Sequence, residues 1–272
     1  MIVGAGGARP ISLAALTVLE VTPAEMVRIA ARCGYSHVGL RPVAATPGEP
    51  HVPILTDPAL RRELLQALRG EGIGVLDVEI VRLRPAMDWD EITRVLDFAA
   101  EFAAPRLLVA DNDPDPARSR EHLARMAAEA SDFGVTPHLE FMPWTEAPGL
   151  AAARERIAGI ANAKLLVDSF HLARSGGTPD EIAPGDPAIG YLQLADIAGP
   201  IPAMDEILAE ARGNRLFPGE GEINLAALLT RLPGLPVSLE IPADRLRDAG
   251  VSAEERARRA IAATRDLLER TG

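Results

Sequence analysis

The stretch between residues 136 and 241 contains four apolar runs of the same design: TPHLEF at 136–141, KLLVDS at 164–169, GYLQLAD at 190–196 and PVSLEI at 236–241. Each run is typical of a buried strand, yet each carries a polar residue at or near its end: Glu140, Asp168, Gln193 or Glu240. Burying a charge that has no partner is energetically costly. The recurrence therefore predicts that the four side chains share one compensating partner.

The rest of the chain repeats the same unit of a strand followed by a helix. We predict eight strands, with seven helical segments between them and one after the last. The expected strands are Ile11–Leu16, His37–Arg41, Gly74–Ile80, Arg106–Ala110, Thr136–Phe141, Lys164–Asp168, Ile189–Ala195 and Pro236–Ile241. Thr22, Thr178 and Ser252 each stand three residues before a glutamate, which predicts three capping boxes at helix starts.

Eight such units in 272 residues predict an α/β fold, a single (β/α)8 TIM barrel that forms one domain over residues 1–272. A doubly wound open sheet has the same alternation. It is less favoured because no G-x-G-x-x-G follows the first strand and because the polar residues come from the last four strands. In a barrel these residues lie at the carboxyl ends of the strands, where barrel enzymes place their active sites.

Composition and charge exclude several classes of protein. The net charge is −11, which gives little support for a nucleic-acid partner, so a small molecule is the expected partner. No apolar stretch approaches the length of a membrane span, and the amino terminus lacks a signal pattern. Cys33 is the only cysteine, which agrees with a reducing compartment. We therefore expect a cytoplasmic protein without a membrane partner. The sequence leaves a homo-oligomer open.

The four strand-end residues offer the chemistry of a divalent metal site. Three carboxylates and one amide oxygen suit Mg²⁺, Mn²⁺ or a similar cation. The alternative for each residue is a structural hydrogen bond to a neighbouring loop or strand. His171 follows Asp168 by three residues, so we expect it on the same face as a candidate general acid or base.

At these residues the chain resembles the xylose-isomerase-like barrel superfamily, the sugar phosphate isomerase/epimerase family. The resemblance rests on the order of Glu140, Asp168 with His171, Gln193 followed by Ala195-Asp196, the loop FPGEGE at 217–222, and Glu240. It implies that Glu140, Asp168, Gln193 and Glu240 bind the metal, and that Glu140 and Glu240 stand on opposite sides of the substrate carbon as catalytic residues. The third ligand is commonly histidine in the family. Glutamine at this position is also seen in its dehydratase branches.

Within the family, the motifs between Leu166 and Glu240 look closest to 3-dehydroshikimate dehydratases, in which Arg82 would occupy the place of a substrate-binding arginine. The loop after the second strand, RPVAATPGEPHVP, departs from the dehydratase pattern. The candidate substrate-binding residues are Arg82, Arg41, His51 and Glu146.

The first functional hypothesis is a metal-dependent enzyme that removes a proton α to a carbonyl of a polyhydroxylated substrate, most simply a dehydratase of the 3-dehydroshikimate type. The alternative is a keto-sugar or sugar phosphate epimerase or isomerase that uses the same metal. A catalytically silent barrel that serves as a binding protein is a third hypothesis. A Schiff-base aldolase is disfavoured because the only lysine, Lys164, begins a strand instead of ending one.

Overall fold

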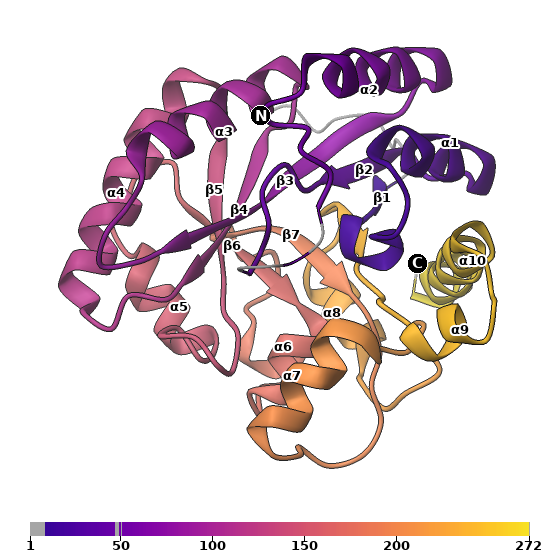
Figure 1. The fold of residues 1–272 in the computed structure, drawn as a ribbon. Coiled ribbons are helices and arrows are strands. Elements are labelled where there is room, and N and C mark those ends of the chain that lie inside the picture. The colour runs from indigo at the N-terminus through magenta and orange to yellow at the C-terminus, as the bar shows by residue number, and fades with distance from the viewer. Residues whose placement is uncertain (1–8, 47–48, 50, 272) are drawn as a thin grey trace.

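Eight parallel strands form a closed barrel, and helices surround it (Figure 1). The computed structural model describes residues 9–46, 49 and 51–271. The strands are β1 (Ile11–Leu13), β2 (His37–Leu40), β3 (Gly74–Leu83), β4 (Arg106–Asp111), β5 (Thr136–Glu140), β6 (Lys164–Asp168), β7 (Ile189–Leu194) and β8 (Val237–Leu239). They follow one another around the barrel in chain order, and β8 pairs with β1. The predicted (β/α)8 barrel is confirmed, and the open sheet is excluded because an open sheet has no pairing between its first and last strands.

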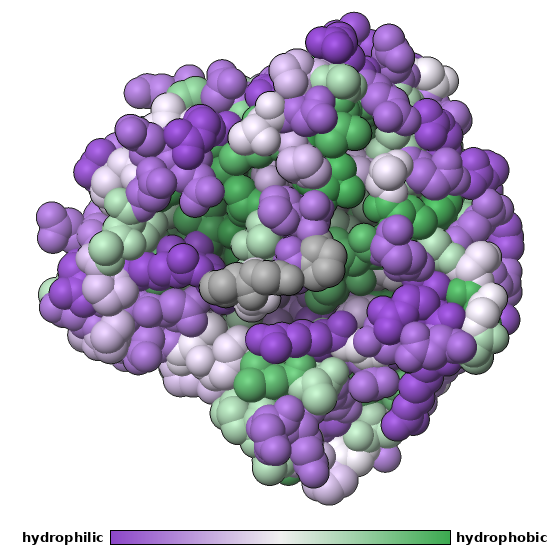
Figure 2. All heavy atoms as spheres, viewed as in Figure 1, coloured by the Kyte–Doolittle hydropathy of each residue, from purple (hydrophilic) through white to green (hydrophobic). Residues whose placement is uncertain are grey.

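Helices connect the strands on the outside of the barrel. They are α1 (Pro23–Cys33), α2 (Pro58–Glu71), α3 (Trp89–Glu101), α4 (Pro116–Asp132), α5 (Leu150–Ile157), α6 (Ser169–Arg174), α7 (Met204–Gly213), α8 (Leu225–Arg231), α9 (Asp244–Asp248) and α10 (Ala253–Thr271), with short 3-10 turns η1 (Ala15–Val18) and η2 (Pro179–Glu181). In the view of Figure 2, hydrophilic residues cover most of the outer surface, and hydrophobic residues are visible in the recesses between them. None of the helices in the described residues has the length and apolar content needed to cross a bilayer.

The first and last strands are shorter than the sequence predicts. The expected continuation of β1 to Leu16 is wrong because η1 begins at Ala15. Thr17 of this turn donates its hydroxyl to the Leu239 carbonyl at 2.7 Å and accepts the Ile241 N–H at 2.8 Å. A side chain thus takes the hydrogen bonds that a longer pair of strands would form. As a result Glu240 lies just after β8.

The three predicted helix starts, at Thr22, Thr178 and Ser252, are present. Two of them begin α-helices, and one begins only a short 3-10 turn. Thr22 and Ser252 accept the N–H groups of Glu25 and Glu255, at 3.3 and 3.2 Å. The Thr178 N–H donates to the Glu181 carboxylate at 2.7 Å, which is the reciprocal half of a capping box. This third start leads only into the turn η2, because the chain is extended again at Ile182.

The inside of the barrel contains polar groups below the carboxyl ends of the strands. Asp77 of β3 is buried and accepts a hydrogen bond from the Tyr191 hydroxyl at 2.8 Å. Burial, together with the nearby charge of Glu79, raises the pKa of Asp77 to about 8. Asp77 is therefore protonated in the folded protein over a pH range in which an exposed aspartate is ionised.

This raised pKa predicts that unfolding depends on pH through Asp77. Unfolded aspartate ionises near pH 3.9, so between that value and about 8 the native state holds a proton that unfolding releases. Stability should therefore fall as the pH rises through this window, by roughly 1 kcal/mol per pH unit from this group. Urea unfolding at pH 5, 6 and 7 should show a shallower decline in Asp77→Asn than in the wild type. Parallel declines would contradict a protonated Asp77.

Candidate active site

The carboxyl ends of the last four strands bring the four predicted polar residues to one end of the barrel. Glu140 and Asp168 are the last residues of β5 and β6, Gln193 is next to last in β7, and Glu240 follows β8. All four side chains are buried, and Asp168 pairs in register with Gln193. Glu140 and Glu240 line a cavity of about 210 Å³, together with His171 of α6. Convergence follows from the fold, because parallel strands in a barrel all end at the same face.

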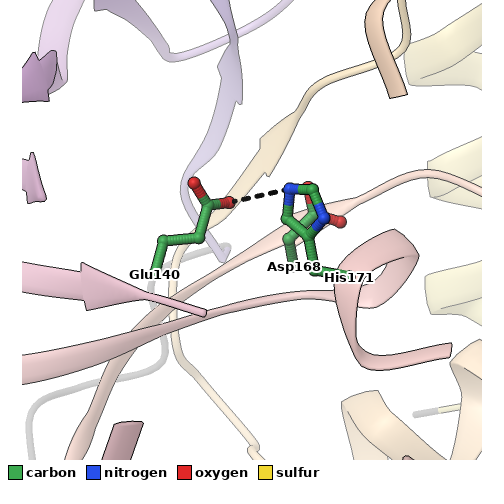
Figure 3. Close-up of side chains that lie close together, drawn as sticks. All are labelled: Glu140, Asp168 and His171. Atoms are coloured by element: carbon green, nitrogen blue, oxygen red, sulfur yellow. Dashed lines mark ion pairs between the residues drawn. The ribbon is translucent and has the colours of Figure 1, made fainter. Parts of the chain in front are cut away.

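Glu140, Asp168 and His171 form a compact cluster. One ligand atom from each residue lies within 4.8 Å of the others, a spacing that could hold a metal ion. The His171 Nε2 atom lies 3.7 Å from Glu140 Oε1 and 3.8 Å from Asp168 Oδ2. Figure 3 shows the imidazole and the Glu140 carboxylate pointing toward each other, with Asp168 beside the ring. The structure thus offers His171 as a metal ligand as well as a proton-transfer group.

The sequence reasoning missed Arg215, which is the principal cation of this site. Its Nη1–H donates to Asp168 at 2.7 Å, and Nη2 lies 2.9 Å from a carboxylate oxygen of Glu240. The side chain is held in place because Nε–H donates to the Ala211 carbonyl and the guanidinium lies over the Phe170 ring. The sequence marks Arg215 only by its place two residues before the FPGEGE loop, which does not reveal its partners.

Burial and mutual charge control the protonation of the site. Burial raises the pKa of Glu140 well above its ordinary value, and the charges of Glu240 and Asp168 add to this effect. Burial also raises the pKa of Glu240. The pKa of His171 is lowered, first by burial and then by the charge of Arg215. Burial alone would lower the pKa of Arg215, but its carboxylate partners more than compensate. The site therefore favours a neutral imidazole at His171. The positive charge that the protein supplies does not fully neutralise the carboxylates beside it.

Two of the predicted ligands have buried atoms without a hydrogen-bond partner among the residues that the structure describes. They are Oε1 of Glu140 and both amide atoms of Gln193. Such atoms are rare in folded proteins because leaving them unpaired is costly. A divalent cation bonded to oxygen would satisfy Glu140 and the Gln193 carbonyl oxygen. The donor set of the site therefore fits a divalent metal.

Of the predicted substrate-binding residues, Arg82 and Arg41 line the cavity. Arg82 is half-buried, and it donates to the Ala45 carbonyl at 2.8 Å and to the Asn112 side chain at 2.9 Å. Arg41 is nearly buried and forms ion pairs with Glu79 at 3.1 Å and Glu49 at 3.3 Å. Arg82 therefore has more capacity left to bind a ligand.

The other two predicted residues lie outside the lining of this cavity. His51 is exposed and lines two neighbouring cavities. Glu146 is also exposed, and its backbone N–H donates to the Asp111 carbonyl at 2.9 Å. The structure therefore brings four of the predicted polar residues together with His171, Arg82 and Arg41, and leaves His51 and Glu146 apart from them.

Glu79 is a further buried acid of the cavity that the sequence reasoning missed. It accepts the Ala15 N–H at 3.2 Å and pairs with Arg41. Its signal was the same as for the other acids, because it interrupts the apolar strand GVLDVEI. Trp144 also lines the cavity and packs edge-on against His171, with ring centroids 5.0 Å apart.

Comparison with known proteins gives one partial relative by sequence. A 3-dehydroshikimate dehydratase from Pseudomonas putida is 41% identical over 91 residues, a match that covers 31% of this chain and 14% of that protein. The chain thus corresponds to a small part of this much longer relative.

Solved structures share the whole fold. A fusion protein of a xylose isomerase-like TIM barrel with 4-hydroxyphenylpyruvate dioxygenase matches with a TM-score of 0.81 and 23% identity, over 97% of this chain and 43% of the fusion. The IolI protein, solved with a bound zinc atom, matches with a TM-score of 0.78 and 19% identity, over 97% and 99% of the two chains. D-allulose 3-epimerase from Methylomonas sp. matches with a TM-score of 0.67 and 16% identity, over 97% and 99%.

The match to a family model decides the relationship. The model described as xylose isomerase-like TIM barrel covers residues 27–267, which is most of the chain. The family resemblance expected from the ordered site residues is confirmed. This chain belongs to the xylose isomerase-like TIM barrel family.

Proposed function

We propose that this protein is a divalent-metal-dependent dehydratase of the 3-dehydroshikimate type. The observation that carries the proposal is the convergence of Glu140, Asp168, Gln193 and Glu240 on the end of the barrel where a small cavity also holds His171. The partial identity to a 3-dehydroshikimate dehydratase supports the reaction type. An arginine in the same cavity supports an acidic substrate.

Glu140, Asp168, Gln193 and Glu240 would hold the metal. When bound, a divalent cation supplies a Lewis acid that polarises a substrate carbonyl and makes the neighbouring C–H more acidic. Arg215 remains between Asp168 and Glu240, where it fixes the orientation of both carboxylates. The buried, apolar contacts of Trp144 and Phe170 with His171 limit the access of water to the imidazole.

His171 would move the protons of the dehydration. A neutral imidazole can accept the proton α to the carbonyl and then return it to the β-hydroxyl, which leaves as water. In this sequence one C–H and one C–O bond break and one C=C bond forms, so atoms and electrons balance. Support for this role comes from the position of His171, which lines the cavity with Nε2 3.7 Å from Glu140 Oε1.

An epimerase or isomerase is the second candidate function, because two carboxylates, Glu140 and Glu240, line the same cavity. Two bases on opposite sides of a carbon can remove a proton from one face and return one to the other. The two candidate functions assign different roles to His171 and Arg82. Variants of these two residues can therefore distinguish a dehydratase from an epimerase.

The first prediction for the proposed function concerns Arg215 and the metal. Arg215→Met leaves Asp168 and Glu240 buried without their cation, so in chelator-treated protein it should lower the free energy of unfolding by about 3–5 kcal/mol. Because a metal binds only the folded site, a fixed Mn²⁺ concentration of about a hundred times the Kd of Arg215→Met should return about 2.7 kcal/mol to this variant. The same concentration should add less to the wild type, where Arg215 already neutralises Asp168 and Glu240 and so weakens the binding of a cation. Chemical unfolding with and without Mn²⁺ measures both values.

Arg174→Met is the matched control, because Arg174 is also buried and pairs with Glu210 at 2.7 Å in a neighbouring cleft. It should lose stability in the same way, but Mn²⁺ should restore no more stability than it adds to the wild type. Equal restoration of both variants would argue against a metal site at Asp168 and Glu240.

A second prediction separates metal binding from proton transfer. Asp168→Ala should lose the metal, whereas His171→Ala should retain it and lower kcat by about 10²- to 10⁴-fold, the contribution typical of a positioned proton-transfer group. Metal analysis of the purified variants and steady-state kinetics give both readouts. Loss of metal from His171→Ala would make the histidine a ligand instead, and unchanged kcat would favour proton transfer by Glu140 and Glu240 in an epimerase.

A third prediction concerns substrate charge. Arg82→Ala should weaken transition-state binding of 3-dehydroshikimate by roughly 1.5–3 kcal/mol, the range for a hydrogen bond to a charged group. A neutral keto-sugar should be affected less. The comparison of kcat/KM for the two substrates measures the difference. Turnover of neutral keto-sugars without any turnover of 3-dehydroshikimate would put the epimerase first.

A further inference from the structure

Four arginines line the cavity above the acidic residues: Arg41, Arg82, Arg212 and Arg215. Two of them are neutralised by the protein itself. Arg41 pairs with Glu79 and Glu49, and Arg215 pairs with Asp168 and Glu240. These two arginines balance buried acids, so they have little attraction left for an anionic ligand.

Arg82 and Arg212 differ from this pair. Neither has a carboxylate within 4.0 Å in the part of the chain that the structure describes. Arg82 uses Nε and Nη1 to donate to Ala45 and Asn112, which fixes its guanidinium. Arg212 is exposed in the last turn of α7, and its side chain makes no hydrogen bond with another described residue. Both retain N–H donors that can reach a ligand.

The two arginines approach the cavity from different sides. Arg82 lies near the end of β3, and Arg212 lies on α7, which follows β7 in the chain; in the view of Figure 1, β3 lies in the upper part of the barrel and α7 below it. Both side chains nonetheless line the same cavity. Burial is the main cause of the lowered pKa of Arg82; the charge of Glu140 opposes this shift, and the charges of Arg84, Arg41 and, least of these, Arg212 add to it. Two guanidiniums that face one cavity repel each other, and an anion between them removes this repulsion.

We propose that Arg212 and Arg82 together bind the carboxylate of the substrate, one from each side of the cavity mouth. The proposal rests on the dehydratase function and narrows it, because the substrate is then a carboxylated polyhydroxy ketone whose carbonyl reaches Glu140 while its acid group stays at the rim. Arg212 is a specificity-determining residue in this arrangement. The carboxylate accepts N–H groups from two elements that are separate in the sequence.

The test compares two ligands that differ only in the acid group. Dehydration of 3-dehydroshikimate yields 3,4-dihydroxybenzoate, and catechol is the same molecule without the carboxylate. Calorimetric titration of the Mn²⁺-loaded protein should show that Arg212→Gln weakens binding of the acid by about 5- to 20-fold, as expected for a partly exposed charge-assisted contact. Catechol binding should stay within about twofold, since no charged contact is lost.

Two further variants sharpen the result. Arg212→Lys keeps the charge and should recover most of the affinity for the acid. Arg245→Gln is the matched control, because Arg245 is an exposed arginine of α9 that lines the neighbouring cleft but not the cavity of the site. It should bind both ligands like the wild type. The double variant Arg82→Gln, Arg212→Gln tests whether the two residues act on one group. Its fold-loss of affinity for the acid should be smaller than the product of the two single fold-losses, because both residues bind the same carboxylate.

The outcomes separate this inference from the proposed function. If the wild type does not turn over 3-dehydroshikimate but Arg212→Gln still weakens the acid selectively, the function is wrong and the carboxylate contact stands. If 3-dehydroshikimate is turned over and Arg212→Gln leaves its KM and the binding of both ligands unchanged, the contact is wrong and the function stands. An equal loss for both ligands would reduce Arg212 to a structural role, and a selective loss for a phosphorylated keto-sugar instead of the acid would overturn the carboxylate assignment.

Discussion

The compensation of buried negative charge at the carboxyl end of the barrel is the constraint on which the site depends. Asp168 and Glu240 are both buried, and both are held by Arg215. Glu79 is held in the same way by Arg41. Glu140 has no arginine within ion-pair distance in the described residues, and one of its oxygens has no hydrogen-bond partner there. The positive charge supplied by the protein therefore falls short at Glu140, which is where a divalent cation has the most to stabilise.

The pairing of Arg215 with buried carboxylates also links the chain segments that follow β6, α7 and β8. Arg215 follows α7, donates to the Ala211 carbonyl of that helix and to the Glu240 carbonyl after β8, and lies over Phe170 of α6. Asp168 in turn accepts the Phe170 N–H at 2.7 Å and so caps α6, the helix that carries His171. A single carboxylate thus binds the arginine, begins the helix and positions the imidazole. The chemistry of the site and the stability of these loops cannot be varied independently.

The sequence predicted most of the architecture because its signals were local. An apolar run marks a buried strand, and a carboxylate within it, such as Asp168, marks a position that needs a partner. The ends of β1 and β8 could not be predicted, because Thr17 replaces strand pairing with hydrogen bonds to residues more than 200 positions away. Arg215 was missed for a similar reason, since its partners come from β6 and the end of β8. Glu79, in contrast, carried the same signal as the four predicted residues.

The placement of charge in the cavity is compatible with the proposed acidic substrate in spite of the negative charge of the whole protein. The net charge of −11 repels an anion at long range, but salt screens this repulsion beyond roughly 10 Å. Under the proposed function, recognition comes from contacts at the cavity, where Arg41 and Arg215 pair with Glu79, Asp168 and Glu240. Arg82 and Arg212 line the same cavity and have no carboxylate partner among the described residues. A substrate that carries a carbonyl at one end and a carboxylate at the other matches this order of charges. A neutral sugar offers no group to Arg82 and Arg212 of comparable charge, which is why the proposal favours the acid.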